Sequence, residues 1–136
     1  MQDRPTAAEL LEAIGELLEG AVLPDTRGPL RHPVRVAGNL CRILEREAEL
    51  GADLEVRELE RLRGLLGDAA GDATDDDTAT DDAATLTAAL AQKLARGDDV
   101  DFEARAWQAL VEIVRGKLRV VKPGHDGYDF AAELPD

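Results

Sequence analysis

Three polar side chains that could bind an anion fall on one line of a predicted helix. Arg35, Asn39 and Arg42 follow one another at steps of four and three residues. Two guanidinium groups beside an amide could hold a phosphate or a carboxylate through charge-assisted hydrogen bonds. The alternative is a solvated or structural helix edge, on which Arg42 pairs with Glu45 or Glu49 and Asn39 bonds a neighbouring loop. Both interpretations stay open on the sequence, although most charged helix faces are solvated.

Residues for other kinds of chemistry are sparse. The chain has no serine, a single cysteine and two histidines, so a serine nucleophile is excluded. Neither His32 nor His125 has a second histidine or a cysteine at ligand spacing, and Cys41 lies on an apolar stripe with no adjacent histidine. The aspartates within residues 75–82 lack the glycine and the terminal glutamate of a calcium-binding loop. The sequence therefore predicts no catalytic residue, no metal site and no cofactor.

The charge of the chain narrows the choice of partners. The formal net charge is −13, and residues 68–82 alone hold seven acidic side chains and no basic one. An acidic surface repels phosphate groups, so neither nucleic acid nor an anionic membrane is an expected partner. A single cysteine allows no intramolecular disulfide, and the charged N-terminal stretch is unlike a signal peptide. We therefore expect a cytoplasmic protein.

The three residues Arg35, Asn39 and Arg42, called the polar line below, must be positioned by helices. The stretch Leu30–Leu50 carries two adjacent apolar stripes at steps of three and four, which predicts a central helix with packed neighbours on at least two sides. Pro33 falls in its first turn, where a missing N–H group does no harm. Gly51 is the predicted end of this helix, and Asp53 is the predicted cap of a separate third helix.

Similar signals predict helices on both sides of this central segment. Thr6 and Glu9 have the spacing of a capping box for a first helix that ends near Pro24. A fourth helix is predicted to start at Asp82 or Ala83 and to end at Gly97. A fifth follows, capped by Asp99 or Asp101, and runs to Pro123. Its apolar positions include Phe102 and Trp107, which we interpret as core residues.

Together these patterns predict an all-α fold. We expect a single domain over residues 1–136, an antiparallel bundle of about five helices. Residues 68–82 are of low complexity and lack large apolar groups, so they predict a disordered acidic loop. Residues 124–136 are predicted to form a turn-rich C-terminal tail.

Three segments carry a resemblance to a known family. They are DRPTAAELL, RVAGNLCRILEREAELG and EIVRGKLRVVKP. The chain resembles a family of small, uncharacterised, all-helical bacterial proteins of unknown function, over most of its length except the acidic loop and the tail. The resemblance implies genes that often lie near those of aminoglycoside-phosphotransferase-like kinases and acyl-CoA dehydrogenases. It thereby implies an accessory role linked to such an enzyme.

Two functions are compatible with these observations. The first is a non-catalytic accessory or interaction protein that binds a partner protein, such as a kinase-like or acyl-CoA-metabolising enzyme, or forms a homodimer. Broad apolar helix faces and the absence of catalytic motifs favour it. The alternative is a binder, or an enzyme, for a small anionic ligand such as a phosphorylated metabolite or a CoA ester, with Arg35, Asn39 and Arg42 as the ligand-binding residues.

Overall fold

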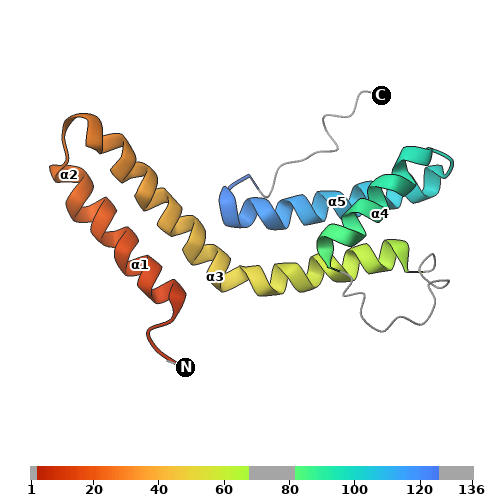
Figure 1. Cartoon of the computed structure of the whole chain (residues 1–136), viewed down its shortest axis with the longest axis horizontal. Helices are drawn as coiled ribbons and strands as arrows, with labels where there is room; N and C mark the ends of the chain where they lie inside the picture. Colours follow the sequence, from red (N-terminus) through yellow and green to blue (C-terminus); the bar gives the residue numbers. More distant parts are fainter. Residues whose placement is uncertain (1–2, 68–81, 126–136) are drawn as a thin grey trace. The chain divides into compact units, whose positions relative to one another are not determined.

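The computed structural model describes residues 3–67 and 82–125, and every regular element within them is helical. The predicted acidic loop, up to residue 81, and the C-terminal tail beyond residue 125 lie outside the described residues. The all-α prediction is confirmed (Figure 1). The longer helices are α1 (Ala7–Leu17), α3 (Arg31–Leu66), α4 (Ala83–Arg96) and α5 (Val100–Val121), with the short α2 (Leu23–Asp25) between α1 and α3.

The N-terminal helix begins as the sequence predicts. The hydroxyl of Thr6 accepts a hydrogen bond from the backbone N–H of Glu9 at 3.2 Å, and the Glu9 carboxylate accepts one from the Thr6 N–H at 2.8 Å. The helical segment ends near Pro24, as predicted, but it includes that proline. A π-helical turn, Leu18–Val22, continues it into α2, which contains Pro24. Proline is tolerated there because it lies in the first turn of α2, where its missing N–H is not needed.

The predicted break after the central helix is wrong. α3 is one continuous helix of 36 residues that includes both Gly51 and Asp53. A glycine inside a helix costs only about 1 kcal/mol relative to alanine, which is too little to end a helix that is favourable on both sides of it. The described residues therefore hold fewer long helices than the predicted five.

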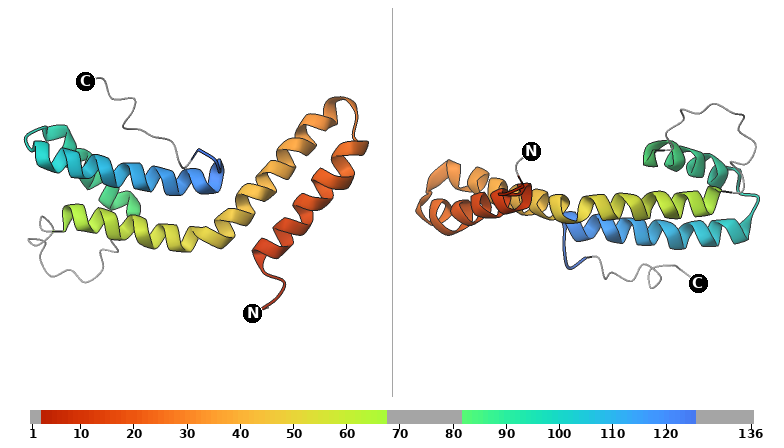
Figure 2. Two further views of the ribbon diagram at one scale, coloured as in Figure 1. Left: turned by 180° about the vertical axis from the view of Figure 1, so that it is seen from behind. Right: turned by 90° about the horizontal axis from the view of Figure 1, so that it is seen from below.

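The chain divides into two compact units, and α3 and α5 each contribute to both. The first unit comprises Met1–Ala52 and Arg119–Pro123. In it, α1, the π turn and α2 pack antiparallel to the first part of α3 (Figures 1 and 2). The second unit comprises Asp53–Leu118 and Gly124–Asp136, and its described part contains the rest of α3, α4 and most of α5.

The hydrophobic core lies in the second unit. Its largest fully buried side chains are Phe102, Leu62 and Leu90, one from each of the three helix segments. The remaining buried members are Leu66, Leu86, Ala106 and Ile113. The core position predicted for Phe102 is confirmed, whereas Trp107 is 45% exposed and the prediction that it is a core residue is wrong.

Local hydrogen bonds set the ends of the helices in this unit. Asp82 caps α4 by accepting the Thr85 backbone N–H at 2.7 Å, and Asp99 caps α5 by accepting the Phe102 N–H at 2.9 Å. Gly97 ends α4 in the left-handed conformation, with φ of 63°, which glycine adopts without a steric penalty. These ends agree with the sequence prediction.

Candidate functional site

The candidate anion-binding residues all lie on the first part of α3. Arg35 and Asn39 are exposed, while the Arg42 side chain is 28% exposed. They follow one line along the helix, as the spacing predicts, but the structure gives Arg42 partners of its own. Its use in binding a ligand therefore has to be weighed against those partners.

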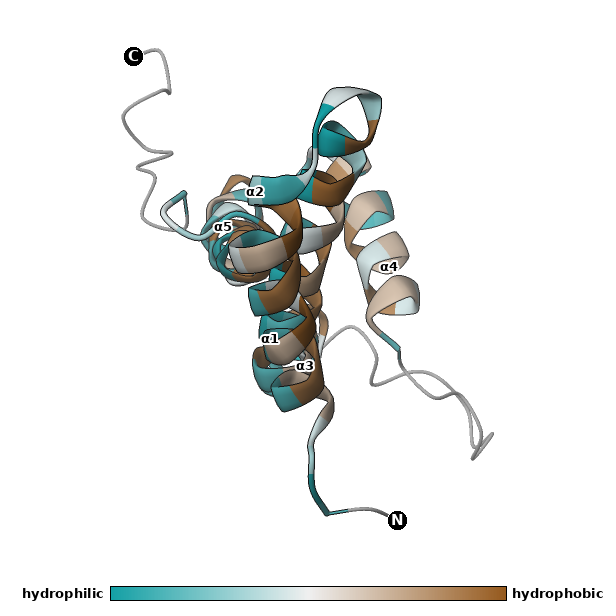
Figure 3. Ribbon diagram, turned by 90° about the vertical axis from the view of Figure 1, so that its left-hand side faces the viewer, coloured by the Kyte–Doolittle hydropathy of each residue, from teal (hydrophilic) through white to brown (hydrophobic). Residues whose placement is uncertain are grey.

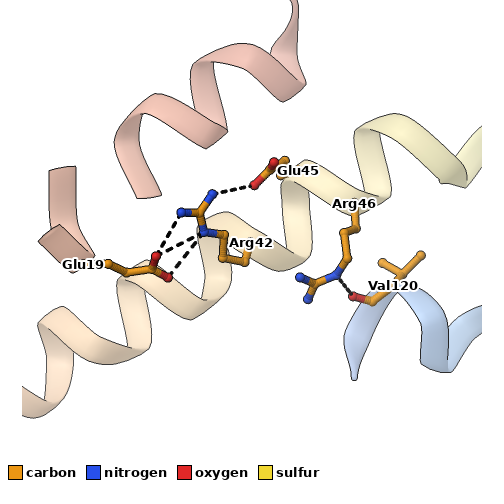
Figure 4. A network of polar contacts seen from close by, with 5 residues as sticks. All are labelled: Glu19, Arg42, Glu45, Arg46 and Val120. Carbon is orange, nitrogen blue, oxygen red and sulfur yellow. Dashed lines mark hydrogen bonds and ion pairs between the residues drawn. The ribbon is translucent and has the colours of Figure 1, made fainter. Parts of the chain in front are cut away.

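Arg42 connects two helical segments through two carboxylates. Its Nη2 and Nε donate to Glu19 at 2.9 and 3.2 Å, and its Nη1 donates to Glu45 at 3.0 Å (Figure 4). The hydrogen bonds that Arg42 donates to Glu19 and, to a smaller extent, to Glu45 raise the pKa of its guanidinium above the ordinary value. The pairing with Glu45 is one of the structural alternatives that the sequence predicts. The pairing with Glu19 is not predicted, because Glu19 lies 23 residues away on another segment.

Two glycines allow α1 and the π turn to approach α3 closely. A Cβ atom on Gly15 would lie 3.3 Å from Cζ and Nε of Arg42 and 3.5 Å from Cβ of Cys41. On α3, a Cβ atom on Gly38 would lie 3.2 Å from Cγ of Glu19. Both glycines are buried, so the close contact brings the Glu19 carboxylate within reach of Arg42.

A second arginine on the same side of α3 also has a structural partner. Nε of Arg46 donates to the backbone carbonyl of Val120 at 2.6 Å (Figure 4). Val120 belongs to the last turn of α5, where backbone carbonyls lack helical partners and where a cation is favourable. Arg46 therefore holds the C-terminal end of α5 in the first unit.

Anion binding by Arg35, Asn39 and Arg42 stays a prediction, because these contacts do not test it. A phosphate or carboxylate ligand at Arg42 has to compete with two carboxylates that are already within 3.0 Å of its guanidinium. The geometry does offer a complete structural explanation for Arg42: it ties the π turn to α3 and pairs within its own helix.

The opposite side of the α1–α3 pair is apolar and exposed. We use the term apolar face for five side chains that are between 48% and 58% exposed: Leu10, Ile14, Leu17, Leu40 and Leu44. Figure 3 shows hydrophobic residues gathered along one side of α1 and hydrophilic residues along the other. Val36, on the next turn of α3, is 41% exposed.

Helix geometry places all five side chains on one side of the pair. Each helix turns by about 100° per residue. On α3, Leu44 lies about 120° from the line through Gly38 on one side, and Arg42 lies about 40° from it on the other. Leu40 lies about 160° from that line, at the outer edge of the same side as Leu44. On the partner segment, Leu10, Ile14 and Leu17 lie on the side away from Glu19. The hydrogen bond between Arg42 and Glu19 shows that the polar sides of the two helices face the same direction. The apolar sides of the two helices therefore also face one direction, opposite to the polar one.

The sequence predicts that Leu30–Leu50 is a central helix with packed neighbours on at least two sides. The structure gives this stretch two neighbours, α1 with its π turn at Gly38 and the end of α5 at Arg46, but the stretch buries few of its apolar side chains. Its buried residue in the structure is Gly38, while Leu40 and Leu44 are half-exposed. The signal for the apolar face was present as two adjacent apolar stripes, but periodicity alone does not tell a buried stripe from an exposed one.

The remaining candidates carry little chemistry. Among residues 3–67 and 82–125, no group of three or more histidine, cysteine, aspartate or glutamate side chains could hold a metal ion. His32 and His125 are exposed, and Cys41 is only partly buried against the α1 contact. In that same part of the chain, no helix is both long and apolar enough to cross a membrane.

A shallow concavity in the second unit lies beside Trp107. It measures about 670 Å³ and is lined mainly by apolar or small side chains, among them Leu94, Ala104 and Leu110. Its lining includes the acidic Glu103 and no basic residue. It therefore has no group that would attract the anionic ligands considered for the polar line.

Comparison with known proteins gives a family but no function. Neither the curated proteins nor the solved structures give a match. One family model matches residues 24–125, which is most of the chain and includes α3, α4 and α5 but not α1 or the π turn. Its description is a domain of unknown function, and this agrees with the resemblance to an uncharacterised family. The chain belongs to the DUF6285 family.

Proposed function

We propose that this protein is a non-catalytic accessory protein that binds another protein chain through the apolar face of its first unit. The observation that carries the proposal is the exposure of Leu10, Ile14, Leu17, Leu40 and Leu44 on one side of a single helix pair. Large contiguous apolar patches on proteins typically mark interaction sites, whereas single exposed apolar residues do not.

The helix pair of the first unit leaves most of its large apolar side chains partly or largely exposed. In α1 and the first part of α3, the buried residues are Gly15 and Gly38, which have no side chain to bury. Layers of helices are stable when their apolar sides are covered by another layer. A helix pair with one uncovered apolar side is therefore suited to receive a further layer from another chain.

The contacts on the polar side of the pair support this role, because they hold α1 and the π turn in a fixed position against α3. Arg42 joins the π turn to α3 through Glu19, and the two glycines hold the helices close together. A preformed surface binds with a smaller loss of conformational entropy than one that must be ordered on binding. In this proposal Arg42 serves as part of the scaffold for the binding surface.

The family resemblance implies a partner class, namely a kinase-like or acyl-CoA-metabolising enzyme encoded nearby. The proposal adopts this class for the accessory role. A helix pair inserted against an enzyme in this way would act by positioning or stabilising that enzyme, and the described residues of the chain would contribute no catalytic group.

The experiment is affinity capture from an extract of the native host with two matched variants. Leu40→Glu places a charge in the apolar face, and Val56→Glu places one at an equally exposed apolar position of α3 in the second unit (51% and 54% exposed). We expect the native chain and Val56→Glu to recover the same identified enzyme, and Leu40→Glu to recover at most a tenth as much. Equal recovery by all three chains, or recovery of no specific protein, would contradict the proposal.

A further inference from the structure

We infer that the C-terminal segment of this chain, residues 126–136, packs in an extended conformation along an exposed apolar stripe of α5. The segment lies outside the described residues and beyond residue 125, where the match to the family model ends. The stripe belongs to the second unit. The inference is therefore independent of the proposed function, which uses the apolar face of the first unit.

One side of α5 carries apolar side chains that the described helices leave largely uncovered. We use the term α5 stripe for six residues at steps of four and three: Val100, Ala104, Trp107, Val111, Val114 and Leu118. At about 100° per residue these six lie within about 80° of one another around the helix, and the buried Phe102, Ala106 and Ile113 lie on the opposite side. Val100, Trp107 and Val114 are between 41% and 77% exposed. The stripe therefore has an apolar surface to offer to another segment.

The surface beside the stripe is hollowed at Trp107. The concavity of about 670 Å³ is lined by Leu94 of α4 and by Ala104, Trp107 and Leu110 of α5. An aromatic side chain gains most from a site in which its ring is covered by other apolar groups, and edge or offset contacts with a second ring add to this. The concavity is therefore suited to receive an aromatic side chain.

The sequence of the C-terminal segment has the period of an extended chain. From residue 128 to residue 134, every second position is apolar: Tyr128, Phe130, Ala132 and Leu134. The intervening positions include the acidic Asp129 and Glu133. Successive side chains of an extended chain point to opposite sides, so the apolar positions share one side and these two carboxylates share the other. A single row of apolar side chains fits a narrow apolar stripe.

The chain changes direction just before this segment begins. α5 ends at Val121, and a turn follows at Pro123 and Gly124. Gly124 has φ of 96°, a conformation that glycine adopts without a steric penalty. The segment therefore starts near the C-terminal end of α5, from which it can run back along the helix.

The segment is also long enough to cover the stripe. Its 11 residues span about 36 Å when extended, and the 19 residues from Val100 to Leu118 span about 28 Å as a helix. Each residue of the segment thus passes about two residues of the helix. Counted from His125 at the level of Val121, Phe130 comes level with Leu110, which lines the concavity beside Trp107.

Charge favours the same arrangement. Residues 126–136 contain four acidic side chains and no basic one, whereas residues 113–122 contain four basic side chains and no acidic one. Of these basic residues, Arg115 and Lys117 pair with Glu112 and Glu58, and Lys122 is exposed just beyond the end of the helix. Segments of opposite charge attract one another. The acidic segment is thus drawn to the half of α5 that lies next to its own starting point.

The covalent link favours this segment over an untethered partner. A short linker gives a tethered segment an effective concentration on the order of millimolar at a neighbouring site. A narrow stripe that would bind a free peptide weakly can therefore be occupied by the end of its own chain.

The experiment uses Trp107 as the probe, because it is the only tryptophan of the chain and belongs to the α5 stripe. Acrylamide quenching and the emission wavelength of Trp107 are measured in the full native chain and in two variants. Ala132→Asp places a charge on the apolar side of the segment, and Ala131→Asp places the same charge one residue away, on the other side. We expect Ala132→Asp to lower the population of the docked segment by about tenfold, which increases quenching and moves the emission to longer wavelength. Ala131→Asp should behave like the native chain.

Equal quenching in all three chains, or an equal increase in both variants, overturns the inference. So does quenching of the native chain that falls as the protein concentration rises, because docking within one chain does not depend on concentration and binding to a second copy does. Circular dichroism checks that each variant keeps its helices, which both substitutions lie outside. Neither variant alters the apolar face of the first unit, so the capture experiment with Leu40→Glu tests the proposed function separately.

Discussion

Substitution of Gly15 by leucine should separate α1 from α3 and so disrupt the surface on which the proposed function depends. Gly15 is buried, and the nearest atoms to an added Cβ are Cζ and Nε of Arg42 at 3.3 Å and Cβ of Cys41 at 3.5 Å. A leucine side chain has three further carbon atoms, and these have no space unless α1 moves. The expected change combines a gain in helix propensity with a loss of packing.

The two terms can be estimated separately. Replacing a helical glycine by alanine gains about 1 kcal/mol, and leucine gains nearly as much. For Gly15→Ala the end of the flexible Arg42 side chain has to shift by only a few tenths of an ångström, so the result should lie between no change and that gain. For Gly15→Leu, overpacking typically costs about 1–3 kcal/mol. The net result should be a loss of up to about 2 kcal/mol in the free energy of unfolding of the first unit.

Gly64 provides the matched control. It lies in α3, it is exposed, and a Cβ atom there would have no neighbour within 4 Å. Gly64→Leu therefore isolates the propensity gain, and it should stabilise the chain by up to about 1 kcal/mol. The difference between the two leucine variants measures the cost of packing at Gly15.

Two measurements are needed because two compact units can unfold separately. Urea unfolding followed by circular dichroism gives the overall change. Native-state hydrogen exchange then locates it, and we expect Gly15→Leu to lower the protection of amides in α1 without changing those around Leu62 in the second-unit core. If Gly15→Leu and Gly64→Leu shift stability alike, and the α1 amides keep their protection, the close contact of α1 with α3 is refuted.

Three further predictions concern the core, a helix cap and the polar line. Leu62→Ala should lower the free energy of unfolding by about 2–5 kcal/mol, and Val56→Ala, on the same helix but exposed, by less than about 0.5 kcal/mol; equal effects in urea unfolding would contradict the assigned core. Hydrogen bonds from the backbone and side chain of Thr85 lower the pKa of Asp82 below its ordinary value of 3.8, so the stabilisation is complete above that pH and is lost as the pH falls through the folded pKa. The difference in Tm between the native chain and Asp82→Ala should therefore shrink below pH 3.8, and a difference independent of pH would contradict this. Because two carboxylates hold Arg42, the third residue of the polar line, we expect coenzyme A and inorganic phosphate to leave Tm unchanged. A rise in Tm that Arg35→Gln abolishes would instead establish anion binding.

The helix ends were predictable because their causes are local. Thr6 with Glu9, Asp82 with Thr85, and Gly97 each act within four residues of the chain. Such signals require no knowledge of the tertiary structure. The same locality misled the prediction at Gly51, since a glycine followed by a possible cap resembles a helix end, whereas the helical hydrogen bonds on both sides outweigh its cost.

The polar line was predictable only in part, for the same reason. Pairing of Arg42 with Glu45 follows from their spacing of three residues on one helix. Pairing with Glu19 depends on the π turn and on the close approach that Gly15 and Gly38 allow, and none of these is visible in a helical pattern. Glu19 affects whether Arg42 is available to a ligand, and its pairing with Arg42 could not be predicted from the sequence pattern.

Leu40 and Leu62 show why an apolar stripe alone does not locate a core. Both lie on α3 and both belong to repeats of three and four residues, yet one is 51% exposed and the other 1% exposed. In the second unit the helix segment around Leu62 has two helical neighbours, α4 and α5, whereas α1 covers one side of the segment around Leu40. The width of the apolar surface on α3 therefore exceeds what α1 covers in the first unit. That excess is the physical reason to seek a further protein layer over Leu40 and Leu44. It distinguishes this surface from the opposite side of α3, where Arg42 and Arg46 already have partners.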